Sequence, residues 1–148
     1  MSSTKKISAM FILEVIGKPA EHLVEALEEI IKKIDEEKDV NVNGKKIKEP
    51  TPMKEQEGFF TTFAEVEVEA ENMMLIAMLM FKYMPAHIEI ISPENITLSN
   101  NEFGEILSEL TRRLHGYDEV ARVLQTERTI LETKLRELMP KEDKKKEK

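Results

Sequence analysis

The chain of 148 residues is 41% hydrophobic and 34% charged, and its formal net charge is −7. This size and apolar content suit one folded domain with an appendage. The acidity argues against a nucleic-acid-binding protein, and the absence of cysteine excludes disulfides, thiolate metal sites and cysteine nucleophiles. Because the N-terminal residues lack the apolar segment of a signal peptide, we expect a cytoplasmic protein that does not enter the membrane.

A strand and a helix are predicted at the start of the chain. Residues 9–16 are rich in strand formers and are followed by Gly17. Pro19 then suits the first turn of a helix, which we expect over residues 20–38. The apolar stripe of this helix is expected to consist of Leu23, Leu27, Ile30 and Ile34.

The next stretch contains a strong local turn signal. Asn43-Gly44 lies between two short alternating runs in residues 40–48, a pattern that predicts a β-hairpin. Residues 49–58 are polar and contain two prolines, so we expect a mobile connection there.

Three further elements follow the connection. Residues 59–69 alternate as a strand, with Phe60, Ala64, Val66 and Val68 on one face and Phe59, Phe63 and three glutamates on the other. Residues 73–84 form a short helix that is apolar all round, which must be covered on two sides and is shorter than the ~20 residues of a membrane span. Residues 87–91 form the last strand.

This order of elements predicts an α+β, ferredoxin-like βαββαβ domain with an antiparallel sheet, the first and third strands being central. We expect this domain over residues 1–98, a C-terminal helical segment over 99–139 and a disordered charged tail over 140–148.

The turn after the first strand, Gly17-Lys18-Pro19-Ala20-Glu21-His22-Leu23, resembles the corresponding turn of ACT-type regulatory domains. The Asn43-Gly44 insertion departs from their compact second strand. The resemblance implies a small-molecule-sensing module, with the ligand bound near Gly17, Lys18, Pro19 and Glu21.

The C-terminal segment carries an apolar heptad repeat over five heptads: Phe103, Leu107, Leu110, Leu114, Tyr117, Ala121, Leu124, Leu131, Leu135 and Leu138, with Arg128 in phase. A sustained 3.5-residue period predicts a coiled-coil seam. His115-Gly116 is also a usual helix stop, so a continuous helix and a helical hairpin both remain open. The seam can pack against the chain's own body or against a partner.

The second face of the sheet is expected to hold an apolar patch formed by Met10, Ile12, Ile16, Phe59, Phe63 and Ile91. A patch of this kind on a protein surface usually meets another surface. His87 with Glu65, Glu67 and Glu89 is also compatible with a metal or acid–base site, although alternating glutamates usually form the wet face of a strand.

No catalytic motif or cofactor-binding loop is recognisable, so we predict a non-enzymatic scaffold or adaptor without a cofactor. It is expected to form a homo-oligomer, in the first place a dimer. For the sheet patch, the chain's own terminal helix, a second copy and a different protein all remain open as the covering surface. The residues expected to carry association are Ile12, Phe59, Phe63 and Ile91 of the sheet and Leu124, Leu131 and Leu138 of the terminal helix. The alternative is the ligand-sensing module described above.

Overall fold

A computed structural model describes residues 6–139 of the chain. The chain divides into two compact units, Met1–Asn100 and Asn101–Lys148. The first unit contains five strands and two helices, and the second contains nearly all of one long helix.

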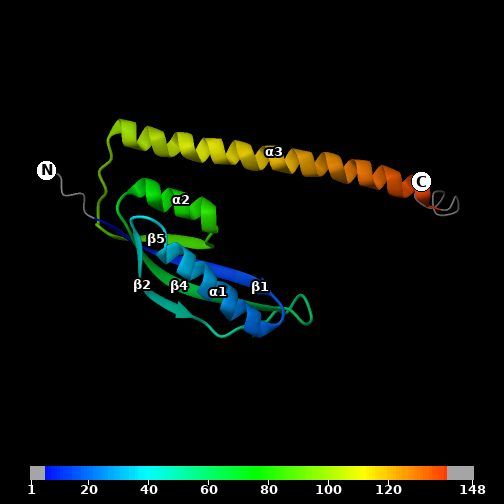
Figure 1. Ribbon diagram of the computed structural model, residues 1–148, viewed down its shortest axis with the longest axis horizontal. Helices are drawn as coiled ribbons and strands as arrows, with labels where there is room; N and C mark the ends of the chain where they lie inside the picture. The colour runs from blue at the N-terminus through cyan, green and yellow to red at the C-terminus, as the bar shows by residue number, and fades with distance from the viewer. Residues whose placement is uncertain (1–5, 140–148) are drawn as a thin grey trace. The chain divides into compact units, whose positions relative to one another are not determined.

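The first unit is built on one antiparallel sheet (Figure 1). Its strands are β1 (Ile7–Gly17), β2 (Val40–Ile47), β3 (Thr51–Pro52), β4 (Phe60–Ala70) and β5 (His87–Ser92). They are arranged in the order β2-β4-β1-β5, with β3 paired to β4. Helix α1 (Ala20–Asp35) follows β1, and α2 (Met73–Tyr83) follows β4. The predicted ferredoxin-like order, with the first and third long strands in the centre, is confirmed.

One face of the sheet forms the hydrophobic core with both helices. Strand alternation directs Phe11 of β1 and Val66 of β4 to this face, and both are fully buried. They belong to the same core cluster as Leu27 and Ile34 of α1 and Ile76 of α2. The two helices therefore cover one face of the sheet and leave the other face uncovered.

The predicted stripe of α1 was wrong at one position. Ile31 is buried, whereas Ile30 is only partly buried at the edge of the core. Ile31 lies four residues after Leu27 and three before Ile34, so it completes a narrow stripe on the side of the helix that faces the sheet. Spacing alone permitted either isoleucine, and the position of the sheet decides between them.

The predicted hairpin turn at Asn43-Gly44 was also wrong, because β2 continues through it. Val42 lies opposite Val68 and Gly44 lies opposite Glu67, so Asn43 is an extra residue in a β-bulge. The Asn43 side chain donates to Glu69 Oε2 at 3.2 Å. Pairing of β2 with residues 64–70 of β4 outweighs the local turn preference of this dipeptide.

The chain reverses instead between β2 and β4, in the segment predicted to be a mobile connection. Part of that segment is ordered by pairing, since Thr51 lies opposite Thr61 and Pro52 opposite Phe60. The amide of Met53 also donates to the carbonyl of Phe59 at 2.9 Å. The connection is therefore a hairpin that extends the sheet.

Helix α2 has clear start and stop signals. The Asn72 side chain accepts a hydrogen bond from the Leu75 amide at 3.0 Å, which caps the N-terminus. Met84 adopts a left-handed conformation with φ of 48°, and Pro85 follows. The predicted short apolar helix is confirmed.

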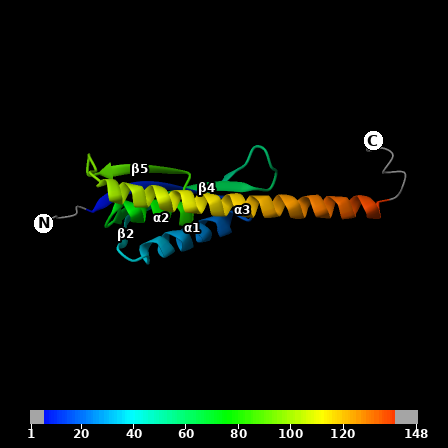
Figure 2. The ribbon, with the colours of Figure 1, turned by 90° about the horizontal axis from the view of Figure 1, so that it is seen from above.

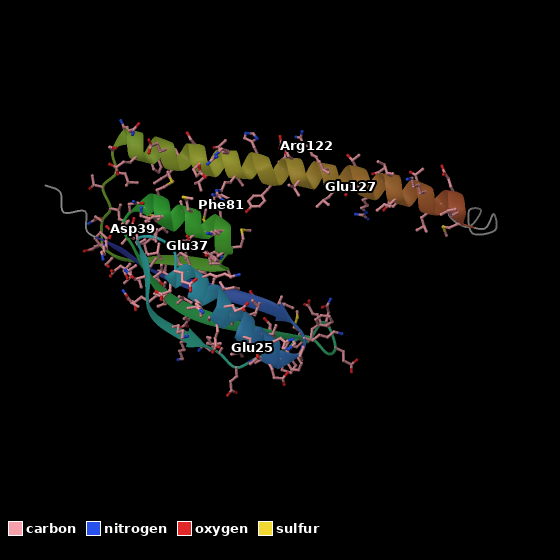
Figure 3. All side chains as sticks on the ribbon, in the orientation of Figure 1. Glu25, Glu37, Asp39, Phe81, Arg122 and Glu127 are labelled. Carbon is pink, nitrogen blue, oxygen red and sulfur yellow. The ribbon has the colours of Figure 1, made fainter. Side chains whose placement is uncertain are left out.

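The ends of α1 and α2 are tied together by side chains that are distant in the sequence. Tyr83 Oη donates to Glu37 Oε1 at 2.7 Å, and the Lys82 ammonium pairs with the same carboxylate. Hydrogen bonds from Lys82 and then from Tyr83 lower the pKa of Glu37 below its ordinary value. Burial, followed by the Glu37 carboxylate, raises the pKa of Tyr83. Figure 3 labels Glu37 in this region.

The second unit is dominated by α3 (Asn100–Leu138), one helix of 39 residues. Figure 2 shows it as an unbroken coil, and it passes through His115 and Gly116 without interruption. The helical hairpin left open by the sequence is therefore wrong, and the continuous helix is correct. At 1.5 Å per residue α3 is ~58 Å long. The predicted disordered tail lies outside the described residues.

Candidate functional site

The uncovered face of the sheet has an apolar column on β1 with acidic columns beside it. Ile12 lies between Glu65 of β4 and His87 of β5. Met10 occupies the same position one pair further on, between Glu67 and Glu89. The predicted apolar patch is thus an apolar ridge, bounded on both sides by mainly acidic side chains.

The structure places the four predicted sheet residues differently. Phe63 lies directly opposite Glu14 and is 41% exposed, so it is on the same face as the partly buried Ile12 and diagonal to it. Ile91 is exposed but lies where the register of β1 and β5 shifts. Phe59 precedes β4, and the Lys18 ammonium is 5.0 Å from its ring centroid. Ile12 and Phe63 are therefore the pair that the sheet brings together.

Several carboxylates of this face have polar partners. Lys6 Nζ lies 3.6 Å from Glu69 Oε1, Ser8 Oγ lies 3.5 Å from Glu67 Oε1, and Thr61 Oγ1 lies 3.4 Å from Glu14 Oε1. These contacts orient the glutamates at the edges of the apolar ridge. Lys46 of β2 lies opposite Glu65, so the acidic column of β4 has a basic side chain beside it at the edge of the sheet.

The alternative metal or acid–base site is not assembled by this geometry. Glu65 and His87 are separated by β1, because both lie opposite Ile12, and two strand spacings amount to ~10 Å. Within residues 6–139, no group of three or more His, Asp or Glu side chains is placed to hold a metal ion. Their spacing fits a solvated strand face.

The predicted ligand turn lies between β1 and α1. A Cβ atom added to Gly17 would come within 3.3 Å of Leu23 Cδ2, so the turn passes close to the first turn of the helix. Pro19 occupies the N-cap position and makes no side-chain cap, and Glu21 is the acidic residue of the first turn. Lys18 is directed over the Phe59 ring, as described above.

The second candidate surface is the apolar seam of α3. Leu124, Leu131 and Leu138 are 57%, 66% and 84% exposed. They lie seven residues apart and therefore on one side of the helix. Charged side chains near them pair along the helix, with Asp118 to Arg122 at 3.1 Å and Arg128 to Glu132 at 3.0 Å. An apolar stripe of this length beside neutralised charges is typical of a helix that packs against another helix.

Comparison with known proteins places the chain in a family. The sequence model of the MJ0538 family matches residues 8–138, from β1 to the last residue of α3. The chain belongs to the MJ0538 family. No curated protein matches the sequence. No solved structure matches it either.

The match to the MJ0538 family covers both candidate surfaces, since the uncovered sheet face and the exposed seam of α3 lie within the matched residues. Across residues 6–139 of this family member, no helix is both long enough and apolar enough to cross a membrane.

A groove in the first unit was not foreseen from the sequence. It has a volume of about 460 Å³ and is formed by α1 and β2, with Glu28, Lys32, Asp35 and Lys45 among its lining residues. Asp35 Oδ1 accepts from the Val42 amide at 2.9 Å and ties the end of α1 to β2. The lining is divided between two elements, and the bulge at Asn43 helps to shape it. Only recognition of that bulge would have indicated the groove.

Proposed function

We propose that this MJ0538-family protein is a non-enzymatic, homo-oligomeric scaffold or adaptor. It associates through the heptad seam of α3 and uses the ridge of the uncovered sheet face as a second interaction surface. The observation that carries the proposal is the row of exposed leucines at heptad spacing, Leu124, Leu131 and Leu138.

The exposed apolar stripe of α3 is long enough to supply free energy for association. Fully burying a leucine side chain is worth roughly 1.5–3 kcal/mol. A 39-residue helix with a leucine exposed at each heptad has that free energy available for association. Arg128 at a core position of the seam weakens packing but helps to fix register.

The two surfaces suit different occupants. Met10 of the ridge has a glutamate on each side, whereas Ile12 has Glu65 on one side and His87 on the other. Two copies meeting through the ridge would therefore bring glutamates close together. The seam of α3 is flanked by ion pairs within the helix, in which an acidic and a basic side chain neutralise each other, so two copies can meet through it. We therefore assign self-association to α3 and the binding of another, basic protein to the sheet face.

The test is the solution mass of the purified chain by multi-angle light scattering. We expect at least twice the chain mass of 17.1 kDa. Leu131→Asp places a charge in the seam and should reduce the mass to that of the monomer. Thr133→Asp, on the outer side of the same turn, is the matched control and should leave the oligomer intact. A monomer at every concentration for the unaltered chain would contradict the proposal.

The second candidate is the small-molecule-sensing module suggested by the resemblance to ACT-type domains. The feature that favours it is the start of α1, where Pro19 leaves the first amides without a side-chain cap. Helix N-termini attract negative charge. A panel of small carboxylates should then raise the melting temperature of the chain, and Lys18→Ala should abolish that rise. Unchanged melting with every compound would remove this candidate.

A further inference from the structure

We propose that two copies pair through α3 in antiparallel orientation with complete overlap of the two helices. This inference rests on the self-association proposed above and specifies its geometry. The occupant of the seam is then the α3 of a second copy, with residue 119 of each copy at the symmetry axis.

Full antiparallel overlap of the two helices agrees with the phase of the heptad. In the heptad, position a holds residues 107, 114, 121, 128 and 135, and position d holds residues 103, 110, 117, 124, 131 and 138. Full antiparallel overlap of Asn100–Leu138 places every a position opposite a d position of the partner. Because the pattern repeats every seven residues, only about one register in seven does so. The register that buries most helix is also the one that aligns both seams.

The antiparallel register also places large side chains of the seam opposite smaller or apolar ones. In this register the large Tyr117 lies opposite the small Ala121 of the partner, so that layer is filled evenly. Arg128 lies opposite Leu110 of the partner, where its methylene stem can pack while its head remains in water. A parallel pair would instead stack tyrosine on tyrosine and alanine on alanine. It would also bring two Arg128 side chains together within the seam.

The two halves of α3 carry net charges of opposite sign. Residues 100–119 contain five acidic and two basic side chains, a net charge of −3 with histidine neutral. Residues 120–138 contain three acidic and four basic side chains, a net charge of +1. Antiparallel pairing places each half against the half of opposite sign, whereas parallel pairing places the acidic halves together.

The charged side chains that flank the seam also favour the antiparallel orientation. Arg113 and Glu127 both hold position g, and in an antiparallel pair the g positions of the two helices flank the seam on the same side, so Arg113 lies beside Glu127 of the partner at two places related by the axis. Arg112 and Arg113 both pair with the carboxylate of Glu109 in their own helix. Asp118 meets its own copy at the axis, where its pairing with Arg122 neutralises it.

In a parallel pair Glu127 would lie beside Glu132 of the partner, so its contact across the seam would be repulsive instead of attractive. It would also bring Arg113 to Asp118 of the partner, although Asp118 is already paired within its own helix. Glu127 therefore distinguishes the two orientations. Figure 3 labels it on the second half of α3.

The first experiment is the charge reversal Glu127→Arg. The residues three and four positions away on both sides are Val123, Leu124, Ile130 and Leu131, all apolar, so no ion pair within the helix changes. In the antiparallel dimer two attractive pairs become repulsive, and the dissociation constant should rise at least about five-fold. In a parallel dimer the same change would tighten binding. Glu119→Arg, on the outer side of the helix, is the matched control and should have little effect on the dissociation constant.

The second experiment uses the absence of native cysteine. Leu114 lies opposite Leu124 of the partner, so a mixture of Leu114→Cys and Leu124→Cys chains, distinguished by a tag, should form a mixed disulfide. Each variant alone should fail to cross-link, because its two cysteines lie ten residues apart along the axis, ~15 Å. Glu119→Cys, at the axis but on the outer side, is the negative control.

The outcomes separate the two proposals. A dimer in which each single-cysteine variant cross-links to itself, and which Glu127→Arg tightens, would overturn the antiparallel inference and leave self-association intact. A chain that is monomeric at every concentration would overturn both. A mixed disulfide with a weakened Glu127→Arg dimer establishes the antiparallel pair.

Discussion

The contact between Glu37 and Tyr83 gives a measurable prediction for the way in which α1 and α2 are held together. Tyr83→Phe removes one hydroxyl and keeps the ring, so the loss is confined to the 2.7 Å bond to Glu37. Hydrogen bonds to charged groups are worth about 1.5–3 kcal/mol. The Glu37 side chain is 27% exposed and keeps Lys82 as a second partner, so we expect a smaller loss, about 1 kcal/mol.

The assay is urea unfolding followed by circular dichroism. With a slope of about 1.5 kcal/mol per molar urea, Tyr83→Phe should lower the midpoint by roughly 0.7 M at pH 7. Glu37→Gln removes the charge that strengthens this bond and should cost a similar amount. The double variant should cost less than the sum of the two, because both changes act on the same bond. Glu36→Gln, at the exposed neighbouring position, is the control.

The pH dependence of this loss follows from the two pKa shifts. The pKa of Glu37 is lowered from 4.5, so its stabilising contribution is present above that pH and is lost as the pH falls through the lower folded-state pKa. The pKa of Tyr83 is raised from 10.0, so its contribution is present below that pH and declines above it. The difference in the free energy of unfolding between the unaltered chain and Tyr83→Phe should therefore be largest near pH 7. A constant difference from pH 2 to pH 11 would refute the reasoning.

Three further predictions concern the sheet and its faces. Leu27→Ala should lower the free energy of unfolding by about 3 kcal/mol, whereas Ile30→Ala should cost less than about 1.5 kcal/mol, because only Leu27 is fully buried; equal losses in urea unfolding would contradict the assigned stripe. Gly44→Ala should be neutral or stabilising by up to about 1 kcal/mol, since its added Cβ would meet only the Glu67 side chain at 3.7 Å; a marked fall in melting temperature would mean that Gly44 is needed for a turn. Phe63→Glu should leave the oligomer intact in light scattering and reduce the binding of basic peptides to immobilised chain; retained binding would show that the sheet face is not the docking surface.

The arrangement of the domain could be predicted from the sequence because each element has a strong local period. Alternation in β4 assigned Val66 to the core and Phe63 to the opposite face. The heptad of α3 kept its phase through Gly116, which favoured one helix over a hairpin. These features depend on side-chain periodicity, which sequence spacing reports directly.

The features that were missed depend on pairing between distant segments. Asn43-Gly44 has the composition of a tight turn, but β2 gains more by pairing along β4, and the extra residue becomes a bulge. The bond between Glu37 and Tyr83 joins residues 46 positions apart, and no local pattern indicates it. The division of the sheet face into an apolar ridge and acidic sides required the register of β1 against both neighbours.

The unequal charge of the two surfaces gives the proposed adaptor a physical logic. The glutamates beside the apolar ridge repel those of a second copy, so in the proposed adaptor the ridge remains open when chains associate through the seam of α3. Each copy in an assembly then presents one ridge, and a partner with two basic sites could bind two ridges at once. Such a bivalent contact strengthens binding without new contacts, by raising the effective concentration of the second site. The proposed dimerisation through α3 would therefore support the proposed recognition through the sheet. Loss of the seam should weaken binding of a bivalent basic partner even though no residue of the ridge has changed.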